Sequence, residues 1–270
     1  MPARLIHVSD LHTGARAGPG AEAPLRALVE RVGPDLVVAT GDLTHRGRPD
    51  QHEGAVTFLR GLGPPVLAVP GNHDIPMLPP ARFTHPFREF ERHWETTEPV
   101  HSTAGLHIVG LSSVRPWRHQ SGGLSSEALH GVAARLAEAP PGALRVVCFH
   151  HQLANAPWRT RKRPLARRGQ VLAALAEAGA ELVLSGHVHQ ATVADRREFA
   201  VLDGDSSVVV ISAPGLTRPR PHRLGEAQGA HVITADETSI AVETYVFDDA
   251  TYSAVAERRF LRAGPSAGSS

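Results

Sequence analysis

The sequence has one cysteine, no long apolar segment and almost no net charge, and each of these absences excludes a class of protein. The single cysteine, Cys148, rules out an intrachain disulfide, and its place in an apolar run predicts a small buried side chain. No apolar run approaches the roughly 20 residues that a membrane-spanning helix needs. The chain enters a strand-like run directly after Met-Pro-Ala-Arg, without the regions of a secretory signal. We therefore expect a cytoplasmic protein without a membrane span.

The balance of charges also limits the kinds of molecule that the protein is expected to bind. The 270 residues include 28 Lys and Arg against 27 Asp and Glu, which gives a formal net charge of +1. A chain so balanced lacks the basic surplus of polyanion-binding proteins, and this argues against nucleic acid as a partner. Any attraction for a phosphate group has to be local.

Strand-like and helix-like segments alternate along the first two thirds of the chain. This alternation is typical of an α/β fold with βαβ crossovers and helices on both faces of the sheet. The apolar runs of strand length cover residues 5–8, 36–39, 66–69, 106–111, 146–149 and 182–184. The segments with apolar residues at helical spacing cover residues 23–32, 51–62, 126–139 and 167–178.

The last third has a different pattern. Strand-like runs at residues 208–211, 231–234 and 239–247 are separated by turn signals, which predicts a second, mostly antiparallel sheet packed on the first. Residues 263–270 are small and polar, so we expect a disordered tail after a single domain over residues 1–262.

Residues 79–94 have large apolar side chains at spacings of three and four. This spacing predicts an amphipathic helix. Its apolar face would serve core packing or a homodimer contact, or would line a substrate pocket. The side chains concerned are Phe83, Phe87, Phe90 and Trp94.

The most informative feature is a set of five short strings of oxygen- and nitrogen-bearing side chains, each at the end of a strand-like run. The carboxyl ends of parallel strands meet at one edge of an α/β sheet, so we expect the strings to converge. Carboxylate, amide and imidazole groups together suit Mn, Fe, Zn, Co or Ni. The strings are Asp10-Leu11-His12, Gly41-Asp42, Gly71-Asn72-His73-Asp74, His150-His151 and Gly186-His187-Val188-His189.

The residue types predict how two metal ions would share this site. A hydrolytic pair of ions about 3.5–4 Å apart needs a shared ligand, and a carboxylate bridges better than an imidazole. Asp42 is the bridging candidate, because Gly41 lets the backbone turn sharply beside it. Water between the ions would ionise near neutral pH and act as the nucleophile. The remaining ligands predicted are Asp10, His12 and His189 for one ion and Asn72, His150 and His187 for the other.

His73 and Asp74 follow directly and predict catalytic roles. The side chain of His73 should point away from that of Asn72 and towards the substrate, so we expect it to protonate the leaving oxygen or stabilise its charge. Asp74 would orient the His73 imidazole through its other ring nitrogen. The alternative for Asp74 is a helix or turn cap before Pro76.

In this order the five strings resemble those of the calcineurin-like metallophosphoesterase superfamily. The strings GDLT, PGNHDIP and SGHVH are most similar to class III cyclic nucleotide phosphodiesterases and their bacterial relatives, and the resemblance covers residues 4–215. It implies a four-layer αββα sandwich with two mixed sheets flanked by helices. It also implies two divalent or trivalent transition-metal ions, Mn and/or Fe, with Zn as an alternative. The residues that match the family's ligands and catalytic histidine are Asp10, His12, Asp42, Asn72, His150, His187, His189 and His73.

Two departures from the family pattern concern substrate access. His45 and Arg46 follow Thr44 where the superfamily often has an acidic or amide residue and then Arg. Both would contact substrate; the alternatives for His45 are a place around the metal ligands or in an exposed loop. Gln152 opens a basic segment in which Trp158 could stack on a base, while Arg159 and Arg161 could clamp a phosphate. A solvated loop is the alternative for this segment.

The sequence thus predicts a dinuclear metal-dependent phosphohydrolase for a small-molecule phosphoester, and a phosphodiesterase in particular. Cyclic nucleotides or related phosphodiesters lead as substrates on the resemblance. The alternatives are a pyrophosphatase or phosphodiesterase for a nucleotide- or lipid-linked substrate, a nuclease, and a metal-binding scaffold without activity.

Overall fold

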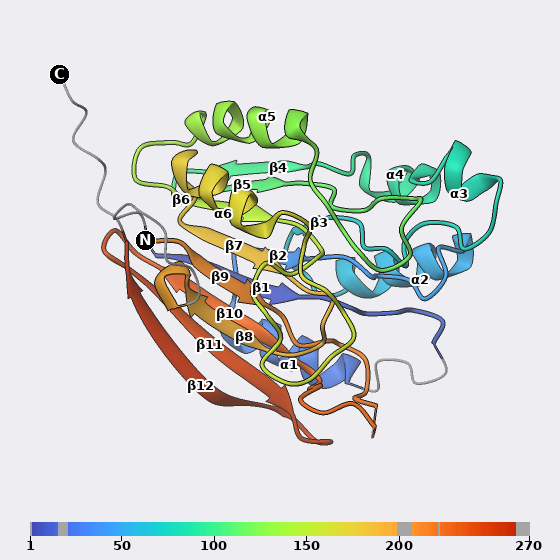
Figure 1. The fold of residues 1–270 in the computed structure, drawn as a ribbon. Coiled ribbons are helices and arrows are strands. Elements are labelled where there is room, and N and C mark those ends of the chain that lie inside the picture. The colour runs from blue at the N-terminus through green and yellow to red at the C-terminus, as the bar shows by residue number, and fades with distance from the viewer. Residues whose placement is uncertain (1, 16–20, 199–206, 221, 263–270) are drawn as a thin grey trace.

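The computed structural model describes residues 2–15, 21–198, 207–220 and 222–262, which form four layers (Figure 1). Two six-stranded sheets pack face to face, and helices cover the outer face of each. The predicted αββα sandwich with two mixed sheets is therefore confirmed. The predicted tail at 263–270 lies outside the described residues, and a single domain over 1–262 stays a prediction. Within the described ranges, no helix is long and apolar enough to cross a membrane.

The first sheet joins the beginning of the chain to its end. Its order is β12-β11-β10-β1-β2-β3, with β1, β2 and β3 parallel and the other three strands antiparallel. The prediction that the late strands form a separate sheet is wrong, because β10 pairs along β1, from Ala3 opposite Ala235 to His7 opposite His231. The strands are β1 (Ala3–Val8), β2 (Leu36–Ala39), β3 (Val66–Ala68), β10 (Gly229–Ala235), β11 (Ser239–Phe247) and β12 (Tyr252–Leu261).

The second sheet has the order β4-β5-β6-β7-β9-β8. Its four central strands are parallel, and β4 and β8 are antiparallel edges. The five strings consequently follow strands of both sheets, not of one. The strands are β4 (Val100–Thr103), β5 (Leu106–Gly110), β6 (Leu144–Cys148), β7 (Leu182–Ser185), β8 (Thr192–Asp195) and β9 (Val209–Ser212), and the short 3₁₀ helix η1 (Arg196–Glu198) follows β8.

Local sequence signals set the ends of several helices. Helix α1 (Glu22–Val32) ends at Gly33, whose left-handed φ of 57° suits glycine. Helix α2 (Pro49–Arg60) begins with proline, whose missing N–H costs nothing at a first helical position. Ser125 caps helix α5 (Ser126–Ala137) by accepting from the Ala128 amide at 3.1 Å. Helices α1, α2 and α4 cover the first sheet, and α5 and α6 (Arg168–Glu177) cover the second (Figure 1).

The helix predicted over residues 79–94 is two helices, α3 (Ala81–Thr84) and α4 (Arg88–Trp94). The break falls at His85, which precedes Pro86 and has φ −145° and ψ 61°, because proline disfavours helical backbone in the residue before it. Phe90 is fully buried against the first sheet, whereas Phe83 is 56% exposed. Of these two helices, α4 packs in the core through Phe90, and Phe83 of α3 does not.

The main core lies between the two sheets. It consists of Leu, Ile and Val side chains from the facing strands, and Cys148 is buried among them as a free thiol. The prediction of a buried apolar role for Cys148 is confirmed. Because residues alternate between the faces of a strand, the other side chains of these strands pack against the helices. With both faces covered, the loops at the strand ends are left to form a site.

Candidate metal centre

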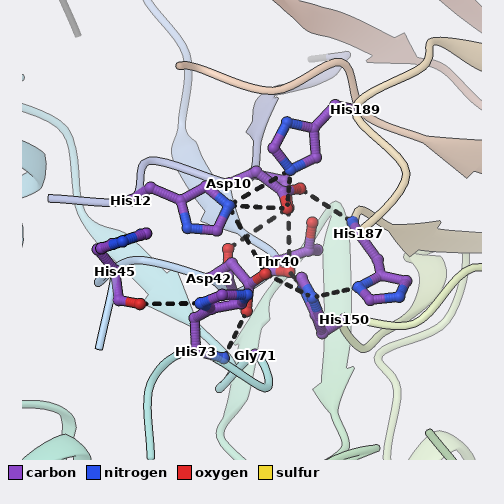
Figure 2. Close-up of polar contacts among 12 residues, drawn as sticks. Asp10, His12, Thr40, Asp42, His45, Gly71, His73, His150, His187 and His189 are labelled. Carbon is purple, nitrogen blue, oxygen red and sulfur yellow. Dashed lines mark hydrogen bonds and ion pairs between the residues drawn. The ribbon is translucent and has the colours of Figure 1, made fainter. Parts of the chain in front are cut away.

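The strings after β1, β2, β3, β6 and β7 converge where strands of both sheets end (Figure 2). Convergence was predicted for one edge of one sheet; here it arises because two sheets face each other with their carboxyl ends together. Three groups of potential ligands result, and within each group the ligand atoms lie within 4.8 Å of one another. One group has imidazoles alone, from His12, His45 and His73. The two groups that contain a carboxylate are Asp10, His12 and His189, and Asp42, His150 and His187.

In the first group, two imidazole nitrogens face one carboxylate oxygen. His189 Nε2 lies 2.9 Å from Asp10 Oδ1, and His12 Nε2 lies 3.3 Å from His189 Nε2. The other carboxylate oxygen, Asp10 Oδ2, accepts from the backbone N–H of His187 at 2.9 Å. The hydrogen bond orients the carboxylate and leaves Oδ1 facing the imidazoles, which is how an outer partner typically orients a metal ligand.

In the second group, His150 is oriented in the same manner. Its Nδ1–H donates to the carbonyl of Thr40 at 2.7 Å, so Nε2 is the nitrogen that can bind a metal ion once it is deprotonated. This Nε2 lies 3.3 Å from Asp42 Oδ2 and 3.1 Å from His187 Nδ1. The two nitrogens and the carboxylate oxygen therefore surround a common point.

Asp42 faces both groups. Its Oδ2 lies 3.3 Å from His150 Nε2 and 3.7 Å from His12 Nε2. Its Oδ1 accepts from the backbone N–H of His73 at 2.8 Å, which fixes the rotation of the carboxylate. This is the position that a shared ligand needs.

Three buried oxygens test whether metal ions fit these residues. In the described part of the chain, Asp10 Oδ1 and Asp42 Oδ2 face imidazole nitrogens without a well-formed hydrogen bond, and Asn72 Oδ1 has no donor. A buried oxygen without a partner costs about 1–3 kcal/mol, and more when it is charged. Two cations at the groups would give Asp10 and Asp42 partners. Asn72 stands in the chain between Gly71 and His73, whose backbones lie against Asp42, so its oxygen suits the second cation. The donor set fits a pair of transition-metal ions.

The backbone at this site is strained. Five of the potential ligands have positive φ, namely Asp10 (57°), His12 (48°), Asp42 (51°), His187 (75°) and His189 (59°). A non-glycine residue in this left-handed region costs on the order of 1–3 kcal/mol, and such residues cluster at functional sites. These backbone conformations cost stability locally, and they place the ligand side chains in the geometry of the site.

Glycines allow the strings to approach one another closely. Gly41 has φ 84°, as expected for the turn beside Asp42. A Cβ on Gly71 would lie 2.1 Å from the backbone nitrogen of Asp42, and one on Gly186 would lie 1.8 Å from Ser9 Oγ. No side chain fits at Gly71 or Gly186 without moving the ligands.

The charges at the centre favour cation binding. Burial by itself would raise the pKa of Asp42, but His150 and the other histidines hold this pKa well below its usual range. For Asp10, His189 has the same effect against burial. Burial lowers the pKa of His12 to about 4, which keeps this imidazole neutral, as a metal ligand must be. Burial would lower the pKa of His150, but Asp42 raises it to about 9, so this imidazole has to lose a proton before it can bind a metal ion. At neutral pH the centre thus presents ionised carboxylates and a neutral His12, and binding of a cation at the second group would release the proton of His150.

His73 lies beside the two groups with its ring held by the backbone. Its Nδ1–H donates to the carbonyl of His45 at 2.8 Å, and its ring centre lies 4.9 Å from that of His12. The prediction that Asp74 orients His73 is wrong, because the His45 carbonyl does so. Asp74 instead accepts hydrogen bonds from the Thr44 amide at 2.7 Å and the Gly71 amide at 2.8 Å. These bonds connect the loop after β2 with the loop after β3. The predicted alternative for Asp74, a role in a turn, agrees better with these contacts.

The predicted substrate residues lie further out. His45 is half-buried and stacks on His73, with ring centres 5.9 Å apart. Arg46, Arg159 and Arg161 are exposed, and within the described residues no contact joins their side chains to the two groups. Trp158 is 58% exposed, and its amide donates to Gln190 Oε1 at 3.0 Å, next to His189 in the chain. Substrate roles for these five residues stay predictions.

Lys162 was not among the predicted residues, although the structure brings it to the centre. Its Nζ donates to the carbonyl of His187, and its ammonium interacts electrostatically with Asp10 and Asp42. A signal existed in the sequence, since this is the only lysine among 28 basic residues.

A four-layer αββα sandwich with paired His/Asp groups at its strand ends is the arrangement of a dinuclear metallohydrolase. The chain belongs to the calcineurin-like phosphoesterase family, whose sequence profile matches residues 3–191. It is 30% identical over 231 residues to a probable cyclic nucleotide phosphodiesterase of Synechococcus, covering 80% of this chain and 85% of that one.

Two further proteins are similar to parts or all of the chain. A glycerophosphodiester phosphodiesterase of Enterobacter lignolyticus is 34% identical over 82 residues, which are 26% of this chain and 29% of that one. The structure of a dimetal phosphatase from Danio rerio matches 97% of this chain and 100% of its own, with a TM-score of 0.68 at 16% identity. At that identity the likeness shows the fold alone.

Proposed function

We propose that the protein is a dinuclear metal-dependent phosphodiesterase. The observation that carries this proposal is the position of Asp42 Oδ2, 3.3 Å from an imidazole nitrogen of one group and 3.7 Å from one of the other. Membership of the calcineurin-like phosphoesterase family and the relatives named as phosphodiesterases support a phosphoric ester as substrate.

The two groups support six of the proposed ligands, and the place of Asn72 between Gly71 and His73 supports the seventh. Bound there, two metal ions would supply Lewis acidity towards a phosphoryl oxygen and lower the pKa of water. Mn and/or Fe suit the mixed nitrogen and oxygen donors, with Zn as the alternative. The proposed ligands are Asp10, His12, Asp42 and His189 for one ion and Asp42, Asn72, His150 and His187 for the other.

His73 is the proposed acid for the leaving oxygen. Because its Nδ1–H donates to the carbonyl of His45, its Nε2 is the nitrogen free to hold or transfer a proton. The ring lies beside His12, outside the two ligand groups, where it can contact a substrate held between them. A proton delivered there stabilises the departing alkoxide.

Cyclic nucleotides are the proposed substrates. The name of the Synechococcus relative and the exposed Trp158 at the rim support a nucleotide with a base to stack on. The second candidate is a diester or pyrophosphate linked to a nucleotide or lipid, for which Arg159 and Arg161 would hold a second phosphate. A cytoplasmic location and a homodimer stay predictions. The near-neutral charge of the chain disfavours a nuclease, and the inactive scaffold is an outcome of the test below.

The test compares three substrates on chelator-treated protein to which Mn²⁺ is restored, with the bound metal counted. We expect bis-p-nitrophenyl phosphate and cyclic AMP to be hydrolysed faster than p-nitrophenyl phosphate. Diester turnover without cyclic AMP turnover would favour the nucleotide- or lipid-linked class. No turnover at two ions per chain would favour a scaffold. Asp42→Ala and Asn72→Ala should abolish turnover while the circular dichroism spectrum remains native.

A further inference from the structure

Lysine is used once in this chain. The sequence has 27 arginines and a single lysine, Lys162. Arginine binds as a rigid planar fork, whereas the lysine ammonium is a compact charge with three donors on a flexible stem. The one position at which the chain has lysine in place of arginine is therefore a position suited to a compact ammonium group.

The Lys162 side chain differs from its neighbours in the same loop. Arg161 and Arg163 are exposed, whereas Lys162 is partly buried and its Nζ donates to the backbone carbonyl of His187. His187 carries the ligand nitrogen Nδ1 of the second group. Of the three ammonium donors, one has an acceptor in the described part of the chain, which leaves two for a ligand.

Among the described residues, the anions that attract the Lys162 ammonium are carboxylates that also have another role. Arg220 and Arg223 lie near it, but both have an ion-pair partner in Glu226, at 2.7 and 3.6 Å. The anions that attract Lys162 are Asp10 and Asp42, the proposed metal ligands. Once these two carboxylates serve metal ions, the ammonium needs another anion, and the phosphoester is the anion that the site takes.

We propose that Lys162 binds a phosphoryl oxygen of the substrate, on the His187 side of the centre. In Figure 2, His73 lies on the left with His12 and His45, and His187 lies on the right beyond His150. The phosphoester would therefore sit between a cation that holds the phosphoryl group and an imidazole that faces the leaving oxygen. This assignment rests on the proposed phosphoesterase function and adds a binding residue that the family's metal motifs do not contain.

The first test uses the uniqueness of the lysine. Native protein with Mn²⁺ restored is treated with N-hydroxysuccinimidyl acetate, with and without inorganic phosphate, and acetylation at Lys162 and at the N-terminal amine is followed by peptide mass spectrometry. We expect phosphate to slow acetylation of Lys162 about tenfold or more in the presence of Mn²⁺ and to leave the N-terminal amine unchanged. Equal acetylation of Lys162 with and without phosphate would overturn the proposal.

The second test uses variants with a matched control from the same loop. Lys162→Met should weaken inhibition by inorganic phosphate and raise KM for bis-p-nitrophenyl phosphate by about 10- to 100-fold, the range for loss of a charged hydrogen bond. Lys162→Arg should recover part of the loss, and Arg163→Gln should behave as the unchanged protein. All variants should retain two metal ions per chain.

A purely structural role predicts a different result. If Lys162 only held the His187 loop in place, Lys162→Met would lose metal and kcat while phosphate inhibition of the loaded fraction stayed the same, and that result would refute the assignment. Failure of the phosphodiesterase proposal is recognised separately, by a lack of turnover in the unchanged protein, because phosphate protection of Lys162 is measured without any turnover.

Discussion

The imidazole of His73 is oriented by a backbone carbonyl and not by a carboxylate. A carboxylate partner would stabilise the protonated imidazole, whereas a carbonyl mainly fixes the tautomer. The side chain of His45, whose carbonyl does this, can therefore be removed without removing the hydrogen bond. This separates the role of the residue's backbone from that of its ring.

His73→Ala should lower kcat by about 10²- to 10⁴-fold, the usual contribution of a general acid, with the largest loss for poor leaving groups. His45→Ala keeps the carbonyl and should lower kcat by less than about tenfold. The measurement is turnover of aryl phosphodiesters with leaving groups of different pKa, at equal metal content. Loss of metal from His73→Ala, or equal losses of kcat in both variants, would contradict the assigned roles.

His231 should make the stability of the protein sensitive to acid. It is fully buried in β10, donates to the carbonyl of Ser212 at 3.1 Å and stacks on His7. Burial lowers its pKa from 6.5 to about 4, so between these values only the unfolded chain binds the proton and acid favours unfolding. The stabilisation is thus complete above about pH 6.5 and is lost as the pH falls towards 4.

His231→Gln keeps a donor for Ser212 and removes the titration. From pH 7 to pH 5, the unchanged protein should lose about 2 kcal/mol more unfolding free energy than this variant. Urea unfolding of both proteins in chelator at the two pH values measures the difference. Parallel losses would mean that His231 binds a proton in the folded state.

The turns at the strand ends depend on glycines that have no room for a side chain. Gly71→Ala would place its Cβ 2.1 Å from the Asp42 amide, so this variant should bind metal much more weakly and be destabilised by several kcal/mol. Gly131→Ala, in the middle of α5 where a Cβ meets nothing within 4 Å, should raise stability by about 0.5–1 kcal/mol. Metal titration and thermal unfolding of both variants test the contrast; full metal binding by Gly71→Ala would show that the turn can relax.

The elements near the site were more predictable than those remote from it. The strand-like runs before the five strings are strands, because a buried parallel strand is apolar throughout and its end is marked by polar residues. The edge strands β4, β8 and β12 were not predicted, since half-exposed strands lack such runs. The break at His85 could have been read from Pro86. The late strands pair with segments that are distant in the sequence. The local pattern of residues therefore does not indicate which sheet each of them joins.

The same distinction holds within the site. Two ligand groups were predicted from side-chain chemistry at strand ends, and the structure brings Asp10, His12 and His189 together and Asp42, His150 and His187 together. The orientation of His73 by the His45 carbonyl could not be predicted, because a backbone acceptor has no signature in residue type. Lys162 lies 25 residues before His187 in the chain, and only the packing of the loop turns it inward.

At the scale of the whole molecule, an arginine at the end of β12 links the two sheets. Arg262 Nε and Nη2 donate to Glu181, at 2.8 and 3.1 Å, and both side chains are over nine-tenths buried. Arg262 also donates to the carbonyl of Ala143 at 3.1 Å. The linkage lies at the opposite ends of the strands from the metal centre, since Glu181 precedes β7 and His187 follows it.

Arg262→Met should lower the unfolding free energy by about 3 kcal/mol, because Glu181 then keeps, among the described residues, only Arg145, through its backbone N–H at 3.1 Å and its side chain at 3.7 Å. Arg262→Lys should restore less than half, because an ammonium cannot form the two-pronged pair. Urea unfolding gives the stabilities, and kcat at full metal loading should be unchanged in both. A loss of kcat would mean that the arrangement of the sheets is transmitted to the centre.

Each of the two ligand groups draws side chains from both sheets: Asp10 and His12 with His189, and Asp42 with His150 and His187. During synthesis, the first sheet's three parallel strands leave the ribosome more than 100 residues before His187 and His189 do. A nascent chain therefore cannot assemble either group until β7 has emerged and the halves have docked. Metal binding is therefore a late step of folding, and a bound metal pair indicates that the two sheets have docked.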